Sequence, residues 1–107
     1  MGLIMDRASP DLMMNRIYRK KPDIISRNIA GQAILVPVRG KVADMQRIFM
    51  LNSVAEFVWE QLSGEIPVNR ICRRVEENFT VIPTIAENDV CELINNLLDL
   101  ELIFEVC

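Results

Sequence analysis

The sequence predicts a single α+β domain in which a three-stranded antiparallel meander precedes three α-helices. Between Asp23 and Asn52 the apolar residues form short runs separated by segments that contain Gly, the pattern of strands joined by turns. After Asn52 they recur every three or four positions, as on the buried face of amphipathic helices. The chain has 107 residues, enough for one hydrophobic core.

The three predicted strands lie in the segments DIISRNI, AILVPV and RIFML. The second contains Pro37, which has no N–H for a ladder hydrogen bond, so we expect Pro37 at a bulge or at the end of the strand. In the third strand, side-chain alternation predicts two faces, one with Arg47, Phe49 and Leu51 and the other with Ile48 and Met50.

The first helix is predicted to begin with the capping box Ser53-Val-Ala-Glu56 and to end at Gly64. Pro67 suits the first turn of the second helix, whose apolar repeat continues to Phe79.

Pro83 and a second capping box, Thr84-Ile-Ala-Glu87, predict the start of the third helix. The closing segment LIFEV is read as a short terminal strand or as a tail.

Residues 1–21 are expected to form an N-terminal arm that frays, and residues 22–107 to form the folded domain. Charged residues and Pro10 interrupt the arm before any apolar run reaches the length of a signal peptide. No later segment reaches the length of a membrane span. We therefore expect a cytoplasmic protein with no membrane partner.

The composition argues against an enzyme and against a bound metal or cofactor. The chain has no His, the commonest general base and metal ligand, and its three Cys residues lack CxxC spacing. Phosphate-binding and hydrolase motifs are also missing from the sequence. Cys72 and Cys91 fall on apolar helical stripes, where Cys acts as a small apolar residue, and Cys107 is expected to be exposed.

Three strands followed by three helices make a winged-helix-like architecture, and specific residues within it carry a further resemblance. In order, these are Phe49-Met-Leu-Asn52, Ala55, Val58-Trp59, Leu62, Gly64, Ile71, Asp89-Val90 and the run from Leu97 to Ile103. This set, spread over about residues 22 to 104, resembles the PqqD family. The family pattern has Gly in its final turn where this chain has Glu101.

The resemblance implies a peptide-binding adaptor of the kind called a RiPP recognition element. Such a module holds the leader segment of a ribosomally synthesised precursor peptide for a modifying enzyme, a radical SAM protein in the pyrroloquinoline quinone (PQQ) pathway. An open strand edge suits this role, because an added peptide strand pairs through its main chain. The groove that the resemblance implies is formed by Arg47, Ile48, Phe49, Met50, Leu51, Val90, Leu93, Ile94 and Leu97. The alternative for most of these side chains is plain core packing.

Charge is unevenly distributed along the chain. Residues 1–52 carry a net charge of +5 and residues 53–107 a net charge of −8. From Ala86 to Ile103 there are five acidic residues and no Lys or Arg, which predicts a leader with basic residues beside its apolar anchors. Two basic groups are predicted to contact an acidic patch on the modifying enzyme, or else to be solvated surface: Arg70, Arg73 and Arg74, and Arg19, Lys20 and Lys21.

Two other classes of function compete with the adaptor. A winged-helix DNA-binding regulator shares the architecture, but its third helix has to approach phosphates, and here that helix is acidic. A dimerisation module is the second alternative, because an apolar edge strand or an N-terminal arm also exchanges between two copies of one chain.

Overall fold

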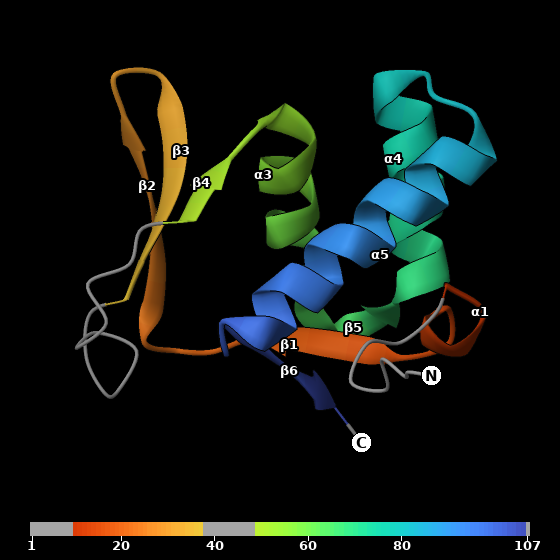
Figure 1. Ribbon diagram of the computed structural model, residues 1–107, viewed down its shortest axis with the longest axis horizontal. Helices are drawn as coiled ribbons and strands as arrows, with labels where there is room; N and C mark the ends of the chain where they lie inside the picture. Colours follow the sequence, from red (N-terminus) through yellow and green to blue (C-terminus); the bar gives the residue numbers. More distant parts are fainter. Residues whose placement is uncertain (1–9, 38–48, 107) are drawn as a thin grey trace, which may run out of the picture.

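The computed structural model describes residues 10–37 and 49–106 (Figure 1). In chain order its elements are α1 (Pro10–Met13), β1 (Ile17–Lys20), β2 (Ile24–Ile29), β3 (Gln32–Pro37), β4 (Phe49–Leu51), α3 (Ser53–Gln61), β5 (Ser63–Pro67), α4 (Val68–Phe79), α5 (Pro83–Asp99) and β6 (Ile103–Val106). The α+β class predicted from the sequence is confirmed, with antiparallel strands and three long helices.

The predicted meander is one of two small sheets, in the strand order β2-β3-β4. β2 and β3 are joined by a two-residue turn at Ala30 and Gly31, both with positive φ, as a tight hairpin requires. Pro37 is the last residue of β3, at a strand end as expected. β4 then pairs antiparallel with β3, so that Met50 lies opposite Ile34.

The second sheet, in the order β5-β1-β6, was not predicted as a sheet. β1 pairs antiparallel with β6 from Ile17 opposite Val106 to Lys20 opposite Ile103, and β5 pairs with the other edge of β1. The expectation of a fraying arm is therefore corrected for residues 10–20, where Met13 and Tyr18 are buried in the core. Residues 1–9 lie outside the described part of the chain.

Both predicted capping boxes are wrong, although the helices they introduce exist. Asn52 caps α3, and its side-chain oxygen accepts a hydrogen bond of 2.8 Å from the Ala55 amide. Ile82 precedes α5 and makes no side-chain cap, and Pro83 is the first helical residue. Thr84 therefore lies inside the helix.

The end predicted for the first helix is also corrected. α3 ends at Gln61, and Gly64 belongs to β5 with a φ of 84°. A Cβ atom at Gly64 would come within 3.1 Å of the Arg19 side chain, so the close approach of β5 to β1 favours Gly there. For the last segment, the strand alternative is confirmed by β6.

One hydrophobic core joins the two sheets to the helices. Leu35 and Leu51 enter it from the first sheet, and Tyr18 and Ile103 from the second. Figure 1 shows α5 running diagonally across the molecule, with α3 and α4 beside it and β1, β5 and β6 at its lower end. None of the described helices is long and apolar enough to span a membrane.

Cys72 and Cys91 are both in this core, which confirms their predicted role as small apolar residues. Burial raises the pKa of the Cys72 thiol to about 12 and that of the Cys91 thiol to about 11. Both thiols are therefore protonated at neutral pH. Cys107 lies outside the described residues.

Candidate functional site

The outer edge of β4 is the first feature of the candidate site. In the order β2-β3-β4, β3 occupies one side of β4, and no strand of the described residues pairs with the other side. Figure 1 shows β4 between β3 and α3, with its outer side turned toward the helices. Such an edge offers backbone N–H and C=O groups to an added strand.

A side-chain hydrogen bond indicates which backbone groups face this edge. The side-chain amide of Gln32, on β3, donates a hydrogen bond of 2.7 Å to the Leu51 carbonyl, so this carbonyl points toward β3. Backbone groups of successive residues in a strand point to opposite sides. The N–H and C=O groups of Met50 therefore point toward the open edge.

The side chains of β4 alternate as the sequence predicted. Phe49 is half-buried, Met50 is 65% exposed and Leu51 is buried. Leu51 and Phe49 thus share the face that packs on the core, and Met50 lies on the opposite face. Arg47 and Ile48, the other two residues predicted to bind from this strand, lie outside the described residues.

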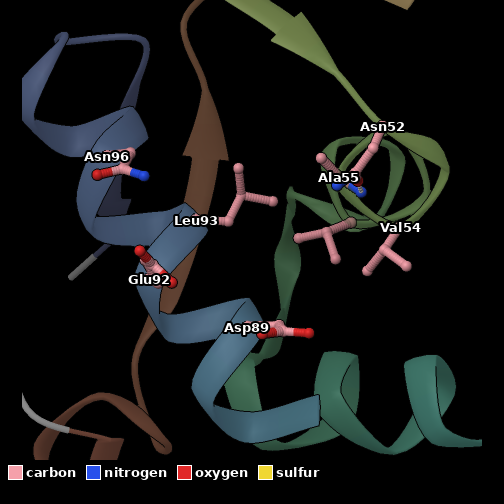
Figure 2. Close-up of a pocket in the computed structure, with 8 residues that line it drawn as sticks. Asn52, Val54, Ala55, Asp89, Glu92, Leu93 and Asn96 are labelled. Carbon is pink, nitrogen blue, oxygen red and sulfur yellow. Dashed lines mark hydrogen bonds between the residues drawn. The ribbon is translucent and has the colours of Figure 1, made fainter. Parts of the chain in front are cut away.

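The second feature is a hollow of about 250 Å³ between the start of α3 and the outer side of α5, here called the α3–α5 hollow. Figure 2 shows Leu93 and Asp89 pointing from α5 toward Val54 and Ala55 on α3. The hollow begins directly after β4, because Asn52 follows the last strand residue. Its lining is formed by Asn52, Val54, Ala55, Val58, Asp89, Glu92, Leu93 and Asn96.

Of the four α5 residues predicted to bind, only Leu93 lines this hollow. Val90, Ile94 and Leu97 are fully buried in the core and do not reach it. The lining residues of α5 form the neighbouring stripe of the helix, at positions 89, 92, 93 and 96. The α3 residues of the lining were not predicted. One feature of the sequence could have indicated these residues. The helix begins immediately after the edge strand, so its first turn has to lie beside that edge.

The α3–α5 hollow is acidic. Asp89 and Glu92 are exposed at it, and no Lys or Arg belongs to the lining. Neither carboxylate has a hydrogen-bond or ion-pair partner among the described residues. Within the same part of the chain, no three Cys, Asp or Glu side chains are grouped so that they could hold a metal ion.

The cations of the described chain lie elsewhere. Arg70, Arg73 and Arg74 line a separate hollow on the outer face of α4, where the Arg74 guanidinium donates a hydrogen bond to the Gln61 side chain. Lys20 makes a cation–π interaction, because its ammonium lies 5.6 Å from the centre of the Trp59 ring.

Comparisons with known proteins agree with this architecture. Residues 32–103 match the family described as coenzyme PQQ synthesis protein D (PqqD). Among solved structures, the chain is similar to the one described as TbiB1 in complex with the TbiA(beta) leader peptide. The TM-score is 0.64 at 18% identity, over 79% of this chain and 93% of that one, which shows a shared fold. A search of curated proteins found no match.

Proposed function

The chain belongs to the PqqD family, and we propose that it is a non-catalytic adaptor that binds the leader segment of a precursor peptide and presents it to a modifying enzyme. The observation that carries this proposal is the open edge of β4 directly beside the α3–α5 hollow. The edge supplies main-chain hydrogen bonds and the hollow supplies side-chain contacts, which together are the two requirements of strand addition.

In the proposed complex the leader becomes a fourth strand, next to β4. The N–H and C=O groups of Met50 pair with its main chain, which gives affinity without demanding a particular sequence. Every second leader side chain then points to the same face as Leu51, where α3 and α5 lie. Selectivity comes from those side chains.

The fold similarity to TbiB1 supports this proposal, since that protein was solved with a leader peptide. The second partner is a modifying enzyme, of the radical SAM class in the PQQ pathway. Arg70 and Arg73 on α4 are exposed, and the hollow that they line shares no residue with the α3–α5 hollow. They offer this enzyme a basic surface while the leader is bound.

A DNA-binding regulator fits the observations poorly. α5, the helix that would have to enter the major groove, contains no Lys or Arg, and its outward stripe carries Asp89 and Glu92. Such a surface repels phosphates instead of releasing counterions from them. None of the comparisons points to nucleic acid.

An amide-resolved NMR titration tests the adaptor. The labelled protein is titrated with a synthetic leader segment encoded by a short reading frame beside its gene. We expect saturable shifts of the Met50 amide and of amides at positions 52–55 and 89–96. Shifts confined to Arg70–Arg74 on addition of duplex DNA, with no response at Met50 to any such leader, would support the regulator instead.

A further inference from the structure

We propose that the α3–α5 hollow is a subsite for a Lys or Arg side chain of the bound leader, whose aliphatic stem packs on apolar side chains while its charged head meets Asp89 and Glu92. This inference rests on the proposed function and adds to it the chemical class of one leader residue. In this proposal the two stripes of α5 have different roles. The strongly apolar stripe packs in the core, and the neighbouring stripe contacts the leader.

The positions on α5 place both charge and apolar surface at the same opening. Asp89 and Glu92 are three residues apart and Asp89 and Leu93 are four apart, so all three occupy one face of the helix. Leu93 is half-buried and points toward α3, and Asp89 points in the same direction (Figure 2).

The opposite wall of the hollow is apolar. Val54, Ala55 and Val58 line it from α3, and Val58 is fully buried. A wholly apolar ligand side chain would suit this wall but would leave the carboxylates beside it without a partner. Long cationic side chains suit both, because their methylene stems bury against apolar surface while the charged end stays at the polar rim.

The two carboxylates are available for such a ligand. Both are exposed, and neither is paired with a described residue. The whole of α5 contains no Lys or Arg that could neutralise them. A cation that arrives with the leader therefore meets two carboxylates that no described residue pairs, which favours basic residues and disfavours acidic ones at this position.

Strand addition brings a leader side chain to this place. A strand added at β4 has its inward side chains on the same face as Leu51. Asn52 immediately follows Leu51 and is part of the lining of the hollow. An inward leader side chain near the end of β4 is thus next to the opening.

The experiment uses the leader segment that binds in the NMR titration. Each of its Lys and Arg residues is replaced in turn by norleucine, which keeps the stem and removes the charge, and the Kd is measured by calorimetry. We expect one replacement to weaken binding about twofold to fivefold, the upper part of the range for exposed charge pairs. The same replacement should have little effect on binding to the double variant Asp89→Asn, Glu92→Gln. Glu60→Gln removes an exposed charge of α3 outside the lining and should retain the wild-type response.

A charge exchange provides the second test. Asp89→Lys should bind the original leader more weakly, and a leader with Glu at the identified position should recover affinity for this variant. A leader that binds at Met50 without basic residues, or whose basic residues can all be replaced at no cost, would overturn the subsite and leave the adaptor standing. Failure of every leader to bind would remove the adaptor, and the subsite with it.

Discussion

The Leu102 amide donates a hydrogen bond of 2.9 Å to the Leu97 carbonyl, which ends α5 in a Schellman motif. The companion bond runs from the Glu101 amide to the Leu98 carbonyl over 3.0 Å. Leu97 and Leu102 are both buried in the same hydrophobic core, and these are the two positions of the motif that usually carry apolar residues. Its left-handed position is Glu101, with a φ of 61°.

Glu101→Gly should therefore stabilise the protein. A side chain at a positive φ costs about 1 kcal/mol, and Gly, which the PqqD family has at this turn, removes that cost. We expect urea unfolding to give a free energy higher by about 1 kcal/mol, somewhat reduced by the greater freedom of Gly in the unfolded chain. Glu101→Ala is the control, because Ala keeps the strain. An equal gain from Ala would show that charge, not backbone strain, is responsible.

The cap of α3 leads to a second stability prediction. Asn52→Ala removes the acceptor for the Ala55 amide and should lower the free energy of unfolding by about 1 kcal/mol. Ser53→Ala should cost much less, because Ser53 lies inside the helix. Urea denaturation of the two variants compares them directly. A larger loss for Ser53→Ala would mean that the capping box read from the sequence is used after all.

The two buried thiols predict a loss of stability in alkaline solution. An unfolded thiol titrates near pH 9, whereas the folded pKa values of Cys72 and Cys91 are about 12 and about 11. Between pH 9 and about 11 the folded state therefore holds more protons than the unfolded state, and stability falls as pH rises. The slope is at most about 1.4 kcal/mol per pH unit for each thiol.

Urea unfolding in the presence of a reductant, from neutral pH upward through this range, measures that slope. Cys72→Ala is the informative comparison. Its cavity lowers stability at every pH, but its dependence on pH should be shallower than that of the unaltered protein. The raised pKa of Tyr18, which is caused mainly by burial, contributes equally to both proteins. Parallel curves would show that the Cys72 thiol does not titrate differently in the two states.

The parts of the fold that the sequence predicted correctly are those set by local signals. Apolar alternation, Gly-containing turns and helical periodicity indicated the meander and the three helices. β1 and β5 were missed because each is specified by a distant partner. IYRK has only two apolar residues, and SGEIP contains Gly and Pro, yet both become strands, because β1 pairs with β5 on one edge and with β6 on the other.

In the candidate site, too, only some of the features could be predicted from local signals in the sequence. The backbone edge could be predicted, because it depends only on strand order. Of the four α5 residues predicted to bind, only Leu93 lines the hollow, because the prediction took the most apolar stripe of the helix for the ligand face. In the structure that stripe, with Val90, Ile94 and Leu97, packs on the core. The stripe that faces the hollow is mixed in character and includes Asp89 and Leu93, so periodicity alone does not single it out.

The outward direction of the Met50 backbone gives the most direct test of strand addition. Met50→Pro removes an N–H group that points away from β3, and Pro is tolerated on an edge strand when the missing N–H faces outward. The β3–β4 ladder should therefore survive, whereas one main-chain hydrogen bond to the leader is lost. We expect leader affinity to fall about tenfold, close to the 1.5 kcal/mol at the upper end for one such bond.

Met50→Ala separates this effect from that of the side chain. It keeps the N–H and removes the exposed thioether, so leader affinity should change by less than for the Pro variant. Calorimetry measures the Kd of both variants. The NMR spectrum checks that the amide signals of Leu51 and Ile34 keep the chemical shifts of the unaltered protein. If Met50→Pro retains its spectrum and binds the leader as tightly as Met50→Ala, the leader does not hydrogen-bond to the Met50 amide. Binding would then depend on the Met50 carbonyl and on side-chain contacts, not on the Met50 N–H.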